Sequence, residues 1–122
     1  MIKSPSSEYY SPKTRILLFT PPPINTFQRG AELASRVPPQ ALDRKFEITK
    51  AYADAVKDVG RDLGVPVLDV WTAVFDAAGR EEKQLAKFMD DGLHLNAEGY
   101  TASGPIIKLR IMELSLDTLD CV

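Results

Sequence analysis

The sequence predicts an α/β fold with a parallel sheet, and three observations support this class. Two short runs, TRILLFT at 14–20 and VPVLDV at 65–70, are almost continuously apolar. Such runs are typical of strands buried on both faces of a parallel sheet. Between them, residues 43–63 carry apolar side chains at steps of three and four, which indicates a long amphipathic helix. The order strand, helix, strand predicts a βαβ unit with a right-handed crossover.

The segments on either side of the first predicted strand are expected to be irregular. Residues 1–13 are rich in Ser, Pro, Lys and Tyr, which indicates a loop or an unanchored tail. The strand is expected to end at PPPIN, because proline cannot donate a hydrogen bond to a sheet ladder. Residues 21–42, which contain five prolines, are predicted to form a long loop. Long loops that leave a buried strand are often functional.

Local signals set the expected bounds of the helices. Asp43 is the predicted N-cap of the long helix, and Gly64 follows its last residue. A short helix at 71–78 and a weakly helical stretch at 81–89 come next. Asn96 is the predicted cap of a last helix at 97–119, in which Gly104 and Pro105 should cause a kink or an interruption. The apolar stripe of the long helix consists of Ile48, Tyr52, Ala55, Val56, Val59 and Leu63.

Two strands are too few for an independent parallel sheet. Parallel strands are usually covered on both faces and have several neighbours. An unpaired strand edge beside apolar surface also favours association with another chain. We therefore expect residues 1–122 to be the C-terminal part of a single α/β domain whose N-terminal strands are missing, and we expect self-association through the exposed sheet edge.

Composition excludes several classes of function. The net charge is −2, with acidic and basic residues interspersed, so nucleic-acid binding has no electrostatic support. No apolar run approaches the roughly 20 residues of a membrane span, and no signal peptide is visible, so a cytoplasmic location without membrane association is expected. Cys121 is the only cysteine and cannot form an internal disulfide or a cysteine cage for a metal.

The only histidine lies in the stretch DDGLHLNAEGY, residues 90–100. Histidine is the usual general base near neutral pH. A carboxylate bonded to its Nδ1–H fixes the ring and its tautomer. Asp91 can reach that nitrogen of His94 if the chain turns tightly, which Gly92 permits. The pair would then leave Nε2 free to face a nucleophile.

The spacing alone leaves other interpretations open. Most histidines in such a pattern are exposed loop residues or helix caps. A metal site is not expected, because one histidine and one aspartate leave the ligand set short and no second histidine or cysteine pair completes it. The wider sequence context favours the catalytic interpretation.

The order of motifs LLFTPPPIN, VPVLDVW and DGLHLNAEGY resembles the SGNH (GDSL-type) hydrolase family, and within it the branch similar to isoamyl acetate-hydrolysing esterase. The resemblance covers about residues 14–109. It implies a three-layer α/β/α sandwich with a parallel sheet, a flavodoxin-like arrangement. It also implies ester hydrolysis through Ser, His and Asp without a cofactor. By this resemblance, His94 is the general base and later the general acid, and Asp91 orients it. The loop after the first strand would line the substrate pocket through Pro21, Pro22, Pro23 and Asn25.

The blocks that carry the family's nucleophile and oxyanion hole are absent from this sequence. It contains neither GDS nor GxND. None of its seven serines follows a buried strand on a sharp turn, so no nucleophile is predicted in this chain. We therefore expect the C-terminal portion of an esterase for small short-chain esters, inactive by itself. Two alternatives remain. One is a non-catalytic remnant that binds a partner such as an esterase paralogue. The other is an unrelated α/β binding domain.

Overall fold

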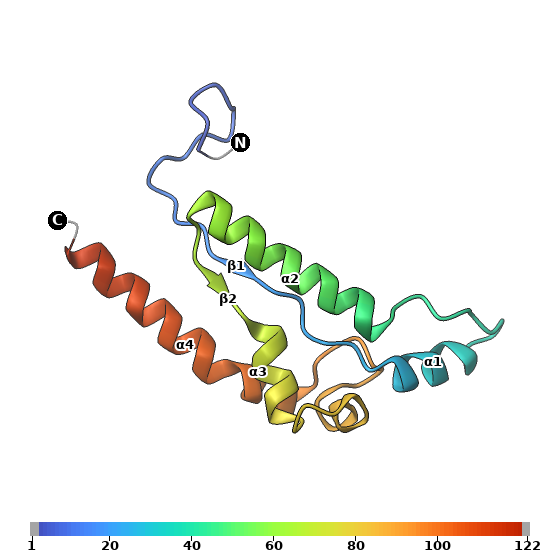
Figure 1. The fold of residues 1–122 in the computed structure, drawn as a ribbon. Coiled ribbons are helices and arrows are strands. Elements are labelled where there is room, and N and C mark those ends of the chain that lie inside the picture. The colour runs from blue at the N-terminus through green and yellow to red at the C-terminus, as the bar shows by residue number, and fades with distance from the viewer. Residues whose placement is uncertain (1–2, 121–122) are drawn as a thin grey trace.

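The computed structural model describes the backbone of residues 3–120 and the side chains of residues 3–113. Cys121 therefore lies outside the described residues. Figure 1 shows the arrangement of the helices and strands. In chain order they are β1 (Leu18–Phe19), α1 (Thr26–Ala34), α2 (Phe46–Leu63), β2 (Val67–Leu68), α3 (Val70–Ala77), the 3-10 helix η1 (Glu82–Phe88) and α4 (Ala97–Asp120).

The two strands pair in parallel, and the predicted helix α2 lies between them in the chain, together with a second helix, α1, that was not predicted. Leu18 lies opposite Val67, and Phe19 lies opposite Leu68. Both strands are shorter than the apolar runs that predicted them. Each contributes two residues to the two-stranded sheet described here. Helix α2 contacts both strands and α4 contacts β2, so the sheet lies between these two helices (Figure 1). The fold is therefore α/β.

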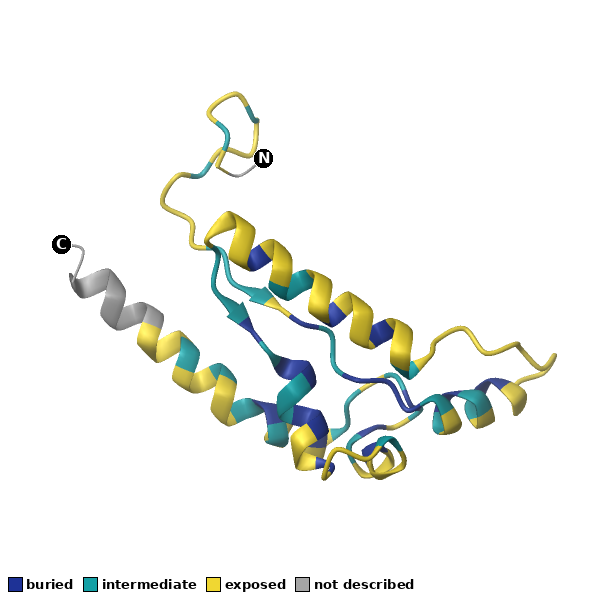
Figure 2. Cartoon of the chain, viewed as in Figure 1, coloured by how far each residue is buried: buried dark blue, intermediate teal, exposed yellow. Residues whose placement is uncertain are grey.

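The core forms around α3. Its buried side chains pack with those of β2 and η1 and with the residues next to the histidine loop. Three aromatic rings, of Phe46, Trp71 and Phe75, are in contact, with centroids 4.8 to 5.4 Å apart. Figure 2 shows that buried residues gather on α3 and on the segment that leads into α1. The core therefore supports the carboxyl end of the sheet, where both of these segments begin.

The prediction that residues 21–42 form one long loop is wrong. Helix α1 occupies Thr26–Ala34 within it, and Asn25 caps this helix by accepting a hydrogen bond from the backbone N–H of Gln28 at 3.2 Å. The prolines lie on either side of the helix, at 21–23 and 38–39. Proline before a helix or after it does not prevent the helix from forming.

Two of the three predicted helix caps are confirmed, and one is wrong. Gly64 follows α2 in the left-handed conformation, at φ 65°, as predicted. Asn96 also caps α4 as predicted, because its side chain accepts from the backbone N–H of Gly99 at 2.9 Å. Asp43 is not the cap of α2, which begins at Phe46, because its carboxylate is instead paired with Arg29. The helix α4 is continuous through Pro105, so the predicted interruption is also wrong.

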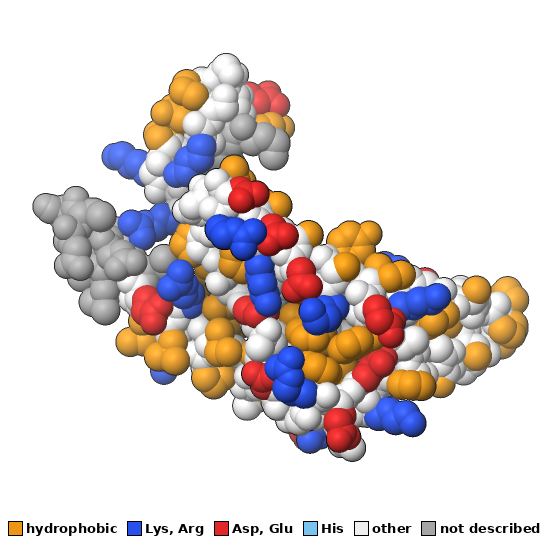
Figure 3. Space-filling view, viewed as in Figure 1, with side chains coloured by type: hydrophobic (Ala, Val, Ile, Leu, Met, Phe, Trp, Pro, Cys, Tyr) orange, Lys and Arg blue, Asp and Glu red, His pale blue; other side chains and the backbone are white. Residues whose placement is uncertain are grey.

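The apolar stripe predicted on α2 is not the face that this helix buries. The buried residues of α2 are Thr49, Ala53 and Gly60. Gly60 lets the helix approach β2, since a Cβ there would lie 2.1 Å from the side chain of Val67. Four large residues of the stripe are exposed instead: Ile48, Tyr52, Val59 and Leu63. Figure 3 shows that apolar side chains are exposed among the charged ones on the face of the molecule that it draws.

No helix in the described part of the chain combines the length and the apolar character needed to cross a membrane.

Candidate active site

The TPPPIN segment connects the carboxyl end of β1 to α1. In open α/β sheets, ligands bind outside the carboxyl ends of the strands. Asn25 is buried at the end of this segment and, besides capping α1, donates its backbone N–H to the carbonyl of Gly92 at 3.0 Å. The side chain of Gln28 donates to the carbonyl of Met89 at 3.1 Å. Helix α1 thus holds the histidine loop against the end of the sheet.

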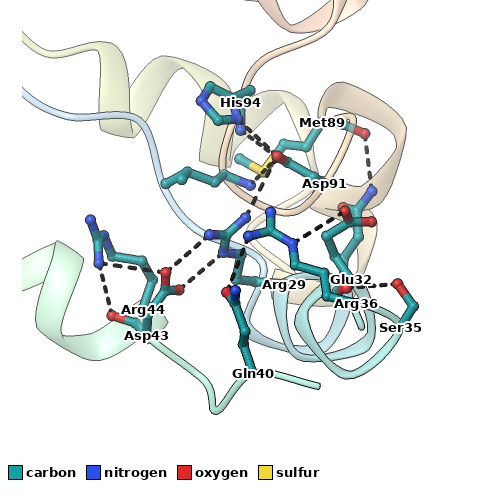
Figure 4. Close-up of polar contacts among 12 residues, drawn as sticks. Arg29, Glu32, Ser35, Arg36, Gln40, Asp43, Arg44, Met89, Asp91 and His94 are labelled. Atoms are coloured by element: carbon teal, nitrogen blue, oxygen red, sulfur yellow. Dashed lines mark hydrogen bonds and ion pairs between the residues drawn. The ribbon is translucent and has the colours of Figure 1, made fainter. Parts of the chain in front are cut away.

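Asp91 and His94 form one local unit, as the sequence predicts. One carboxylate oxygen of Asp91, Oδ1, accepts from the backbone N–H groups of Leu93 at 3.0 Å and His94 at 2.8 Å. The other, Oδ2, lies 2.8 Å from Nδ1 of the His94 ring. The His94 side chain is 71% exposed, against 21% for Asp91. The carboxylate is therefore fixed within the loop and the ring faces outward (Figure 4).

Gly92 allows the loop to pack directly on α1. Its φ is 82°, a backbone conformation that residues other than glycine rarely adopt. A Cβ at this position would lie 2.4 Å from the backbone nitrogen of Arg29 and 2.7 Å from the carbonyl oxygen of Asn25. The position therefore requires glycine both for the turn and for the close approach of two backbones.

The hydrogen bonds of the loop keep Asp91 ionised. Burial raises the pKa of its carboxyl group, but the bonds from the backbone N–H and the ring of His94, and from the backbone N–H of Leu93, outweigh it. The pKa of Asp91 therefore lies well below its usual range. A carboxylate that stays charged is the partner that a histidine needs when it carries a proton during catalysis.

A hollow of about 800 Å³ lies beside the exposed ring of His94. This volume is within the range of small-molecule sites. Its walls come from the loop after β1, from the segment before α2 with the first turns of that helix, and from the histidine loop. The residues that line it are Pro21, Pro22, Ile24, Leu42, Asp43, Arg44, Lys45, Ile48, Thr49, Tyr52, Leu93 and His94.

The structure brings some of the predicted site residues together and separates others from the hollow. Pro21 and Pro22 line it with His94, whereas Pro23 and Asn25 are buried and are not among its lining residues. The described residues that line the hollow include no serine. Nor do the described residues contain a group of three or more His, Cys, Asp or Glu side chains placed to hold a metal ion.

Sequence reasoning missed the wall formed by α2 and the buried Arg29. The residues of α2 that line the hollow include Ile48 and Tyr52, which belong to the apolar stripe. Arg29 lies on α1, a helix that the sequence analysis did not predict. One signal could have revealed this helix: Asn25 is followed three residues later by Gln28, a spacing typical of a helix start.

The low pKa of Asp91 leads to a prediction about stability and pH. Because the pKa is lower in the folded chain than in the unfolded chain, this carboxylate stabilises the fold above about pH 4, and the stabilisation is lost as the pH falls through the folded pKa. Replacing Asp91 with Asn keeps an acceptor oxygen and removes the charge. We expect the free energy of unfolding to fall by roughly 1–3 kcal/mol at neutral pH, with a smaller difference in acid.

Urea unfolding of the two proteins at several pH values measures this difference. Asp58→Asn is a matched control, since Asp58 forms an exposed ion pair with Arg61 on α2 and such pairs contribute little. If the free energies of unfolding of the original chain and of Asp91→Asn differ by the same amount at neutral pH and in acid, the assigned role of the Asp91 charge is contradicted.

The fold and the site define a class of protein: an α/β chain with a carboxylate-bound histidine beside a hollow, an arrangement typical of hydrolases that act through a hydroxyl nucleophile. The model of the GDSL-like lipase/acylhydrolase family matches residues 6–102. The chain belongs to this family.

Curated relatives place it near esterases. It is 28% identical to the human isoamyl acetate-hydrolyzing esterase 1 homolog over 86% of this chain and 41% of that protein. The mouse protein of the same name is 32% identical over 72% of this chain and 33% of that protein. A GDSL esterase/lipase of Arabidopsis thaliana is 29% identical over 80% of this chain and 28% of that protein. The chain thus spans less than half the length of these relatives. No solved structure matches it significantly.

Proposed function

We propose that this chain is the acid–base part of a carboxylic ester hydrolase of the GDSL type. The observation that carries the proposal is the bond of 2.8 Å between His94 Nδ1 and Asp91 Oδ2, with an exposed ring that lines a hollow. Family membership supports ester hydrolysis at the level of the class.

In this mechanism, His94 Nε2 takes the proton from a serine hydroxyl as its oxygen attacks the ester carbonyl. His94 then gives that proton to the departing alcohol, which leaves an acyl-serine. Water repeats the sequence: His94 takes a proton from water, and the acid is released as the serine regains its proton. Asp91 keeps the Nδ1–H in place and stabilises the imidazolium in each half. No metal or organic cofactor takes part.

The serine and the oxyanion-hole donors would come from a further part of the domain, which corresponds to the part of the relatives that this chain does not match. On this view, the chain is the C-terminal part of one three-layer α/β/α domain, and the rest of the domain adds strands beside β1. The exposure of Phe19 on β1 and of Val59 and Leu63 on α2, which do not line the hollow, supports this view, because large apolar surfaces of this kind usually face a partner.

The substrate class that we propose is small esters with short acyl chains. The names of the human and mouse relatives refer to an ester of this kind. Pro21 and Pro22 would contact the substrate from the loop after β1, opposite the α2 residues Ile48 and Tyr52. Pro23 and Asn25 would act indirectly, by holding that loop and the start of α1 in place.

Mapping the 5′ end of the native transcript tests the proposal. We expect an in-frame sequence before Met1 that encodes a strand followed by GDS and, later, GxND. A transcript that encodes no in-frame residues before Met1 would contradict it and would favour the alternative, a non-catalytic fragment that binds a partner.

One observation favours that alternative, with a second copy of the chain as the partner: in the sheet described here β1 pairs only with β2, so its other edge has no strand beside it. Phe19 on this strand is 48% exposed. Light scattering coupled to size exclusion should give a mass that rises above 13.5 kDa with concentration. We expect Phe19→Lys to reduce the association and Val37→Lys, on an exposed loop, to leave it unchanged. A monomer at all concentrations would exclude self-association.

A further inference from the structure

Arg29 is a buried cation that touches both the histidine loop and the wall of the hollow. Its residue is 5% exposed. One edge of its guanidinium binds Asp43: Nε donates to Oδ1 and Nη2 donates to Oδ2, each at 3.0 Å. The remaining nitrogen, Nη1, lies 3.6 Å from Oδ2 of Asp91. Figure 4 shows the guanidinium between the two carboxylates.

The atom of Asp91 that faces Arg29 is also the atom that binds His94. Oδ2 of Asp91 lies 2.8 Å from His94 Nδ1, while Oδ1 is occupied by backbone N–H groups of the loop. The charge of Arg29 therefore attracts the oxygen that orients the imidazole. A guanidinium suits this arrangement because its planar fork can bind one carboxylate with two nitrogens and still present a third.

Asp43, whose carboxylate binds the other edge of the Arg29 guanidinium, is one of the residues that line the hollow and lies just before α2. The hydrogen bond from Arg29 lowers the pKa of Asp43, so this group also remains charged. Helix α1 thus carries one side chain that reaches both the wall of the hollow and the partner of His94. The backbone of the same residue, Arg29, is the surface on which Gly92 packs.

We propose that Arg29 is a positioning residue: it holds Oδ2 of Asp91 in the orientation that accepts from His94 Nδ1, and it joins this pair to the hollow through Asp43. The catalytic meaning of this contact rests on the proposed function, but the contact can be tested without hydrolysis. Arg29 does not touch the substrate in this account and acts only through Asp91.

The test uses the fact that His94 is the only histidine, so the nitrogen signals of its ring can be assigned directly in the labelled protein. At about pH 9, well above the ordinary titration range of histidine, ¹⁵N NMR reports which ring nitrogen carries the proton. We expect the Nδ1–H form to dominate in the unmodified chain. In Arg29→Met, we expect the ratio of the Nδ1–H form to the Nε2–H form to fall at least about twofold.

Two further measurements separate positioning from general damage. The backbone amide signals of Leu93 and His94 report the bonds to Asp91 Oδ1, and we expect them to persist in Arg29→Met. Arg36→Met is the matched control, because Arg36 is exposed and, among the described residues, its side chain pairs with Glu32 and Gln40. It should leave the tautomer ratio unchanged.

An unchanged ratio in Arg29→Met would overturn the proposal, and so would the loss of both amide signals, which indicates a structural role. If Arg29→Met does not fold, Arg29→Lys decides. It keeps the charge but lacks the fork, so the ratio should fall, and an unchanged ratio would again overturn the proposal. Failure of the proposed function would appear separately, as a complete enzyme whose hydrolysis does not depend on His94.

Discussion

Replacing Gly92 with Ala should lower the free energy of unfolding by roughly 2–5 kcal/mol, a large fraction of the stability of a chain of this size. Two effects add. The backbone at φ 82° is strained for alanine, and the new methyl group would meet the backbone of α1 at Arg29 and Asn25. Backbone atoms cannot move aside as a flexible side chain can, so the loop must shift.

The same substitution should disturb the site. Moving the loop away from α1 breaks the bond from the Asn25 N–H to the Gly92 carbonyl and lengthens the contact between Arg29 and Asp91. We therefore expect the Nδ1–H form of His94 to become less populated in Gly92→Ala.

Urea unfolding followed by circular dichroism measures the change in stability. Gly104→Ala is the matched control: Gly104 lies inside α4 with no heavy atom within 4 Å of the place of its Cβ. Alanine in a helix is up to about 1 kcal/mol more favourable than glycine, so this variant should be at least as stable as the original chain. Equal stability of the two variants would show that the close packing of Gly92 is not essential.

The parts of the fold that could be predicted from sequence are those that local patterns determine. The short apolar runs identified both strands and their parallel arrangement. Asn96 was identified as a cap because its signal lies within four residues. The α1 helix was missed because the prolines on either side gave the whole segment the composition of a loop.

Features that depend on distant contacts could not be predicted in this way. The periodicity of α2 indicated an apolar stripe but not whether this chain covers it, and most of it is exposed. Asp43 fits the local rule for a helix cap, but its carboxylate binds Arg29, fourteen residues earlier.

In the candidate site, too, the local contact could be predicted from sequence and the distant contacts could not. The spacing of Asp91 and His94 predicted their contact, because three residues and a glycine turn are enough to form it. The opposite wall, with Ile48 and Tyr52, and the buried Arg29 come from other elements, so only the tertiary structure brings them to the histidine.

The central claim is that Asp91 and His94 supply the acid–base chemistry of an esterase whose nucleophile lies in the remaining part of the domain. A fusion can test it, in which this chain replaces the segment of the mouse relative that aligns with it. We expect the rest of the mouse protein to supply the serine and the oxyanion hole. The unmodified mouse protein is the positive control for hydrolysis, and circular dichroism verifies that each fusion is folded.

The decisive measurement is kcat/KM for p-nitrophenyl acetate, for the fusion and for the isolated chain, each with and without His94→Ala. We expect the fusion to hydrolyse the ester and His94→Ala to lower its kcat/KM roughly 10³-fold or more. The isolated chain should show no hydrolysis that depends on His94. A folded, active fusion whose rate is the same with and without His94 would contradict the account.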